Sequence, residues 1–245
     1  MSLSDIEQQR VKYSLLLPTV FVVVLWVVKL IELSTGYSFA SWGIEPRTLS
    51  GLRGIVFSPF LHGDLSHLFS NSFPVILLGF IILHTYRSIA FELLFWLTVM
   101  SGFWTWVIGR PSYHIGASGV IYGMAFFVFF SGILRKDTRS MALALLVTFF
   151  YGGLIWGLLP IQEGVSWEGH IAGALAGITC AFFYYLNREI EEVSPFVLEG
   201  EEDELEVVGE PFWMPKNKEL PHNISDGEQK WNVKYHYIRK QSDEE

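Results

Sequence analysis

The sequence has little cysteine and little charge, and both shortages narrow the kinds of protein it can encode. A single cysteine, Cys180, occurs in 245 residues. It excludes an intramolecular disulfide and a cysteine-based metal site. Charged residues make up 17% of the chain, and the formal net charge is −8. This acidic excess gives no support to nucleic-acid binding, so we expect no nucleic-acid partner.

Hydrophobic residues make up 51% of the chain, and the mean hydropathy is +0.34. They are concentrated in runs close to the roughly 20 residues that a helix needs to cross a bilayer. The runs are longer than soluble core helices and lack a polar face. No small-residue cleavage site follows the first run, so we expect no removable signal peptide. Six runs are present: 13–31, 67–83, 89–108, 115–134, 141–160 and 169–186. The sequence therefore predicts an all-α polytopic protein of the lipid bilayer with six transmembrane helices.

The composition changes at about Arg188. The segment 188–245 contains about 16 acidic and about 7 basic residues, whereas the preceding part is nearly balanced. We therefore divide the chain into a membrane domain, 1–187, and a short acidic C-terminal tail, 188–245. With fewer than about 60 residues, the tail could form only a marginal core. We expect it to be partly disordered or to form a small appendage, and the sequence does not indicate its partner.

Basic residues flank the predicted spans unequally, which predicts orientation because cytoplasmic ends are richer in lysine and arginine. One side has Arg10, Lys12, Arg87, Arg135, Lys136, Arg139 and Arg188. The other side has Arg47, Arg53 and Arg110, with Lys29 able to extend there from the first span. We expect both termini, and hence the tail, in the cytoplasm. The second, fourth and sixth spans then begin at the outer surface.

Side chains that can act as a nucleophile, a base or a hydrogen-bond donor lie at the outer starts of these three spans. Ser118 begins the fourth, His170 begins the sixth, and His67 and Asn71 begin the second. Each alone has an ordinary explanation, such as a histidine in interfacial water or an asparagine that bridges two helices. Polar groups within spans are costly, however, and tend to face a protein interior or a water-filled cavity. Their common depth indicates one shared site.

These residue types fit acyl transfer. A serine hydroxyl becomes a nucleophile when a nearby imidazole removes its proton, which predicts Ser118 as the nucleophile and His170 as the base. His67 and Asn71 are four residues apart and share one helical face. They could donate to an oxyanion together with the Ser118 N–H, which a helix leaves unpaired in its first turn.

Small and aromatic residues support this hypothesis. Gly116 and Gly119, which flank the predicted nucleophile, leave room for a substrate backbone. Tyr122 lies one turn further along and could pack against the ring of the predicted base. Gly173 and Gly177 form a G-x-x-x-G pair, which would bring the last span close to the fourth.

Three motifs together resemble those of the rhomboid intramembrane serine proteases. They are HGDLSHLFSN, with His62 ahead of the H-x-x-x-N element of His67 and Asn71; GASGVIYG, with a G-x-S-G element; and GHIAGALAG. They fall on the second, fourth and sixth predicted spans, and the resemblance extends over about residues 10–187. It implies a six-span rhomboid-like bundle with a Ser118–His170 dyad. His67 and Asn71 would stabilise the oxyanion, and no cofactor would be needed.

The resemblance also implies that the substrates are transmembrane proteins, cleaved near the outer face of the bilayer. A bare six-span core is typical of prokaryotes, so we expect a bacterial inner membrane. Glu168 and Asp64 lie near the motifs and receive no catalytic role, because the family uses a dyad. Many relatives carry an adjacent Trp-Arg pair in a long first loop; here Trp42 is present without that pair.

Other functions fit less well. The stretch GASGV does not match the G-x-S-x-G elbow of α/β-hydrolases, and the metalloprotease motif H-E-x-x-H is absent. No carboxylate or cysteine convincingly completes a metal site with His62, His67 and His170, so we expect no metal. The alternative is a catalytically inactive rhomboid-like protein that binds membrane clients. Such relatives usually lack the serine or the histidine, so the presence of both favours the enzyme.

Overall fold

A computed structural model describes residues 3–136, 138–161 and 164–187. The regular structure of these residues is helical, and their only pairing of extended backbone joins Ile44 to His114. The all-α prediction is confirmed for this part of the chain. The predicted tail, 188–245, lies outside the described residues.

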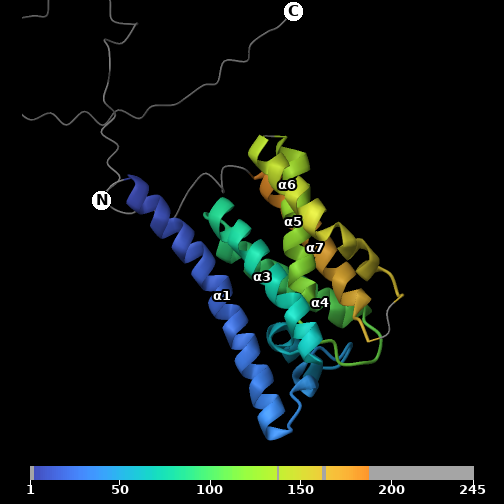
Figure 1. Cartoon of the computed structure of the whole chain (residues 1–245). Coiled ribbons are helices and arrows are strands. Elements are labelled where there is room, and N and C mark those ends of the chain that lie inside the picture. The colour runs from blue at the N-terminus through green and yellow to red at the C-terminus, as the bar shows by residue number, and fades with distance from the viewer. Residues whose placement is uncertain (1–2, 137, 162–163, 188–245) are drawn as a thin grey trace, which may run out of the picture. The chain divides into compact units, whose positions relative to one another are not determined.

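Five helices among the described residues are long and apolar enough to cross a bilayer (Figure 1). They are α1 (Leu3–Thr35), α3 (Leu65–Thr85), α4 (Ala90–Ile108), α5 (Ser118–Arg135) and α7 (Trp167–Leu186). Each exposes large apolar side chains such as Val23, Phe73, Phe95 and Phe183. Extensive apolar surface of this kind is typical of membrane contact. The chain is therefore a multi-pass membrane protein.

The fifth predicted span, 141–160, is not one long helix. It consists of α6 (Thr138–Tyr151), which has 14 residues, followed by the 3-10 segment η4 (Gly152–Leu158). A helix of that length is shorter than the roughly 20 residues that cross a bilayer. Two glycines, Gly152 and Gly153, follow α6, and glycine is a poor helix former. The count of six transmembrane helices is thus not confirmed.

The fourth predicted span begins later than expected. It was predicted from residue 115, but α5 starts at Ser118. Gly116 has a φ of +114°, which is outside the helical region and which glycine adopts without strain. Ser118 is therefore the first residue of its helix, directly after a turn.

Helix α5 lies at the centre of the bundle and contacts α3, α4, α6 and α7 (Figure 1). Its most extensive contact is with α7. A Cβ added to Gly173 would overlap the carbonyl oxygen of Gly119, and one added to Gly177 would overlap that of Gly123. The two backbones therefore touch directly, as small residues allow in membrane helices.

Helix α1 packs along α3, as the blue and teal ribbons of Figure 1 show. The Trp26 Nε1–H donates to Ser72 Oγ over 3.1 Å. Further along, a Cβ on Gly79 would lie 2.9 Å from the Cβ of Pro18. The helix that carries His67 and Asn71 is thus supported by α1 along much of its length.

The connection from α1 to α3 contains four short helices. They are η1 (Ala40–Trp42), η2 (Ser50–Arg53), α2 (Gly54–Phe57) and η3 (Ser58–Phe60). Arg47 fastens this connection to the end of α4, because its Nη1 donates to the carbonyls of Val107 and Gly109. The sequence has no adjacent Trp-Arg pair, yet the fold places the Arg53 guanidinium 5.0 Å from the ring centroid of Trp42. This is a cation–π contact between separated residues.

Candidate active site

Side-chain caps set where α3 and α7 begin. Asp64 Oδ1 accepts the N–H of His67 over 2.8 Å, and Ser166 Oγ accepts the N–H of Gly169 over 3.2 Å. These bonds satisfy N–H groups that lack partners within a helix. The His67 N–H also lowers the pKa of the Asp64 carboxyl, because it stabilises the charged form. The caps place His67 and His170 in the first turns of their helices.

Ser118 and His170 meet across the α5–α7 contact. Ser118 Oγ lies 2.9 Å from His170 Nε2, within hydrogen-bond distance. His170 is 8% exposed. The residues come from helices whose backbones touch through glycine, so the distance between them is fixed by the packing of the bundle.

The His170 ring is oriented by two further contacts. Its Nδ1 lies 2.8 Å from the carbonyl oxygen of Gly157 in η4. A carbonyl can only accept, so Nδ1 carries the proton and Nε2 has a free electron pair directed at the Ser118 hydroxyl. The ring stacks on Tyr122, with centroids 4.2 Å apart and planes 9° from parallel. The imidazole is therefore held in the tautomer that can accept the serine proton.

His67 and Asn71 converge on the turn before Ser118. A Cβ built on Gly116 would lie 2.7 Å from His67 Cε1 and 3.6 Å from Asn71 Nδ2. Any residue larger than glycine would meet the His67 ring there. The Ser118 N–H is at the first position of α5, where a helix supplies no acceptor. Two side-chain donors and one backbone donor are thus gathered in one region.

His62 lies behind Asn71. Its Nε2 is 3.0 Å from Asn71 Nδ2, and its ring centroid is 5.0 Å from that of His67. Burial lowers the pKa of His62 to about 4, with the charge of His67 as the next cause. The imidazole is therefore neutral near pH 7 and accepts one N–H of the Asn71 amide. The amide has a second N–H, which it can direct elsewhere.

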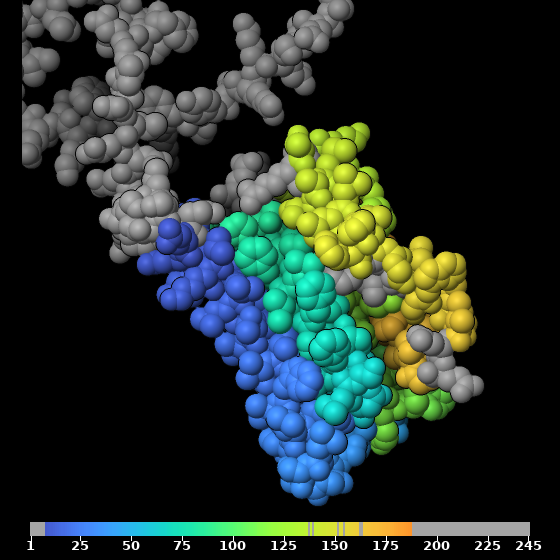
Figure 2. Space-filling model, viewed as in Figure 1, coloured from blue at the N-terminus to red at the C-terminus, as the bar shows by residue number. Residues whose placement is uncertain are grey.

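A cleft of about 1020 Å³ connects these residues. It is lined by residues of α3, α5, η4 and α7, including His67, Asn71, Ser118, Tyr122 and His170. Figure 2 shows the orange surface of α7 between the teal surface of α3 and the yellow surface of η4. The cleft therefore joins Ser118 and His170 to His67 and Asn71 in one continuous space.

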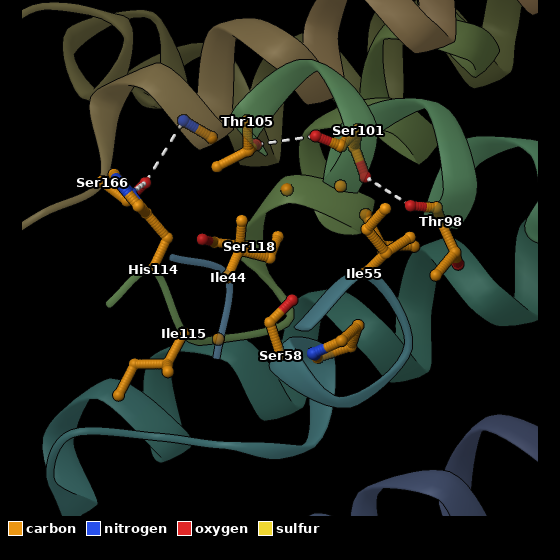
Figure 3. Close-up of a pocket in the computed structure, with 16 residues that line it drawn as sticks. Ile44, Ile55, Ser58, Thr98, Ser101, Thr105, His114, Ile115, Ser118 and Ser166 are labelled. Carbon is orange, nitrogen blue, oxygen red and sulfur yellow. Dashed lines mark hydrogen bonds between the residues drawn. The ribbon is translucent and has the colours of Figure 1, made fainter. Parts of the chain in front are cut away.

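A second, smaller cavity also reaches Ser118 (Figure 3). Its volume is about 30 Å³, and hydroxyl-bearing side chains from α4, such as Ser101 and Thr105, form part of its wall. A cavity needs roughly 10–15 Å³ to hold one water molecule. This one has room for water beside Ser118.

His114 borders both cavities and is one residue that sequence reasoning missed. Its Nε2 lies 3.0 Å from the Arg110 carbonyl oxygen, so that nitrogen carries a proton. Its Nδ1 accepts from Ser166 Oγ over 2.6 Å. Burial lowers the pKa of His114, which keeps the ring neutral. His114 thus fastens the segment before Ser118 to the cap of α7.

Glu168 and Arg110 join the same two segments. Glu168 Oε1 lies 3.6 Å from the side-chain Nε of Arg110, and it also accepts the backbone N–H of Arg110 over 3.4 Å. Arg110 Nη2 also donates to the carbonyl of Val165 over 2.6 Å. These contacts hold the start of α7 against the α4–α5 connection. Glu168, two residues before His170 in the sequence, therefore has a structural role in this junction.

Comparisons with known proteins indicate the same family as the sequence motifs do. A family model described as the rhomboid domain matches residues 50–187. An uncharacterized protein of Mycobacterium bovis and one of Mycobacterium tuberculosis are each 35% identical over 173 residues, which cover 66% of this chain and 71% of theirs. A protein of Acanthamoeba polyphaga mimivirus named as a rhomboid protein is 30% identical over 148 residues, covering 58% of this chain and 80% of its own. The chain belongs to the rhomboid family.

Proposed function

We propose that this protein is an intramembrane serine endopeptidase that cleaves transmembrane segments of membrane proteins. One observation carries the proposal. The Ser118 hydroxyl is 2.9 Å from His170 Nε2, while His170 Nδ1 is bonded to the Gly157 carbonyl, so the imidazole faces the serine as a proton acceptor. A serine paired with an oriented base is the arrangement that nucleophilic catalysis requires.

The reaction follows from these contacts. Ser118 Oγ attacks the scissile carbonyl carbon as His170 Nε2 removes the hydroxyl proton. The carbonyl oxygen becomes an oxyanion, which the Asn71 amide, the His67 ring and the Ser118 N–H stabilise. His170 then protonates the departing amine, leaving an acyl-Ser118 ester. Water attacks the ester with His170 again as base, which releases the second product and restores the serine.

The substrate proposed is a transmembrane helix that can unwind next to the cleft. In a helix, each interior carbonyl is bonded to an N–H, and the surrounding turns shield it from attack. A segment must therefore become extended before a serine can reach its backbone. The cleft beside Ser118 would receive such an extended segment between residues of α3 and η4, which both line it.

The proposed setting is a bacterial inner membrane, with both termini in the cytoplasm. The excess of basic residues near Arg10, Arg87 and Arg135 supports this orientation. Ser118 starts α5, and Arg135 ends it. The dyad would then lie toward the outer face of the bilayer.

Reaction with a fluorophosphonate tests the proposal most directly, because this probe modifies serines that are activated as nucleophiles. We expect wild-type protein in detergent to be labelled and to cleave a single-span model substrate in proteoliposomes. S118A should do neither. S131A is the matched control, since Ser131 is a buried serine near the other end of the same helix. A folded wild-type protein that neither reacts nor cleaves would instead favour an inactive, client-binding rhomboid-like protein.

A further inference from the structure

Two charged side chains are buried in α1, close to its C-terminal end. Lys29 and Glu32 are each 8% exposed. The Lys29 side chain is therefore enclosed by the protein, and its ammonium group reaches the connection before α3. Charges are costly to bury in a membrane segment and are normally paired where they serve a purpose. The contacts of this pair identify the parts of the protein that it joins.

The Lys29 ammonium group makes three bonds, the number that its three hydrogens allow. Nζ lies 3.0 Å from Glu32 Oε2, 2.9 Å from the His62 carbonyl oxygen and 2.9 Å from the Gly63 carbonyl oxygen. The other carboxylate oxygen of Glu32 accepts the N–H of Phe39 over 2.7 Å. The pair therefore fastens the end of α1 to two connecting segments.

The carbonyls that Lys29 binds belong to the short link between η3 and α3. This link lies outside the helices, so neither carbonyl is a member of a helical ladder. The same residue His62 directs its side chain at Asn71, with Nε2 3.0 Å from Nδ2. A continuous path of contacts thus runs from Lys29, through the His62 backbone and ring, to the Asn71 amide.

We propose that Lys29, supported by Glu32, is a positioning residue that sets the direction of the Asn71 amide in the oxyanion site. The inference rests on the proposed function. Lys29 acts through His62: its ammonium fixes the His62 backbone, and the His62 ring then takes one of the two Asn71 N–H groups. The second N–H is left pointing to where the oxyanion forms. Helix α1 contributes to catalysis in this way without lining the cleft.

The test measures the reaction rate with a fluorophosphonate in full-length protein. Negative charge develops on the phosphoryl oxygen as Ser118 attacks, so the rate reports oxyanion stabilisation. Maximal labelling gives the amount of folded enzyme, and the concentration dependence separates the limiting rate constant from the probe's affinity. We expect K29M to lower the limiting rate constant about 10- to 100-fold at unchanged affinity, since small misplacements of catalytic groups have effects of that size.

K12M is the matched control. Lys12 has the same side chain on the same helix, but it is exposed near the opposite end. We expect K12M to leave both constants unchanged. K29R, which keeps the charge and the donors, should recover part of the lost rate. A loss of labelled enzyme in K29M at a normal rate constant would mean that Lys29 only stabilises the fold, and would overturn the inference.

Coupling to Asn71 distinguishes positioning from other effects. If Lys29 acts through Asn71, K29M slows labelling in wild-type protein but has little further effect in N71A protein. An equal loss in both backgrounds would overturn the inference. If K29M does not fold, K29M/E32M removes both charges together, which buried pairs often tolerate. The same rate loss is expected, and a folded double variant with the wild-type rate would contradict it.

The inference and the proposed function fail in different ways. Wild-type protein that does not react with the probe contradicts the proposed function itself. Wild-type protein that reacts normally, together with K29M that reacts at the same rate, contradicts only the role of Lys29.

Discussion

Individual side chains of the dyad act as one unit in the proposed reaction, since Ser118 and His170 share a hydrogen bond. We expect H170A to lower the cleavage rate about as much as S118A/H170A does, because members of such a unit give non-additive losses. Cleavage of a single-span model substrate in proteoliposomes is the measurement. Losses that add between the two single variants would contradict a dyad.

Asn71 should behave differently from the dyad residues, because its proposed role is to stabilise charge and not to transfer a proton. N71A should reduce kcat roughly 10- to 10³-fold with little change in KM. Labelling by a fluorophosphonate should continue at a lower rate. If N71A instead abolishes labelling and lowers the unfolding temperature, Asn71 is a structural bridge between helices.

His62 makes stability depend on pH in a defined direction. Burial lowers its pKa from 6.5 to about 4. Between these values the unfolded chain binds a proton at this position and the folded protein does not. Stability therefore falls as the pH decreases from 6.5 to about 4, and above 6.5 the effect is absent. The full difference corresponds to about 3 kcal/mol. We expect H62Q to lose less stability than wild type over this range, measured by thermal unfolding in detergent.

Among the helices, the α5–α7 contact tolerates the least change. A Cβ on Gly173 would overlap the carbonyl oxygen of Gly119. This oxygen belongs to the backbone, so it cannot avoid the overlap by a change of rotamer. We expect G173A to destabilise the protein by about 1–3 kcal/mol, the usual range for overpacking, and to slow labelling of Ser118. G152A is the control, since its Cβ would meet only Thr148 Cγ2 at 4.0 Å. Equal unfolding temperatures for the two variants would contradict a tight helix contact.

Hydrophobic runs were enough to predict most of these helices. Length and apolar composition give both ends of α3, α4 and α7 to within two residues, because a bilayer sets the length of a span. The first run, 13–31, ends within four residues of the end of α1, but α1 begins ten residues earlier, at Leu3. The break in the fifth run was not predicted. Glycines at 152 and 153 end α6, but glycine is also common inside membrane helices and gives no clear signal there.

The site was predictable where its residues form local motifs, as Ser118, His170, His67 and Asn71 do. Gly157, His114 and Lys29 were missed for a shared physical reason. Each acts through contacts with residues far along the chain, such as the 2.8 Å bond from His170 to the Gly157 carbonyl. A backbone carbonyl has no residue type, so no sequence pattern could have identified that acceptor.

The molecule as a whole should have a single orientation in its membrane. Leu49 lies in the α1–α3 connection and is 86% exposed. Lys136 directly follows the C-terminal end of α5, whereas Ser118 is at the start of that helix. In a C180A background, we expect L49C to react with a membrane-impermeant maleimide added to intact cells. K136C should react only after the cells are opened. The opposite pattern would place Ser118 toward the cytoplasm.

The bond between His170 and Gly157 makes the chemical state of the base depend on a segment that contains neither dyad residue. The acceptor lies in η4, which forms one wall of the cleft. Any displacement of η4 that breaks the bond would release the proton on Nδ1 from its constraint. The imidazole could then carry that proton on Nε2 and face Ser118 as a donor, a form unable to activate it. In the proposed reaction, widening the cleft at η4 would therefore remove the contact that holds His170 in its active tautomer, and attack on a bound peptide would be favoured again once η4 returned.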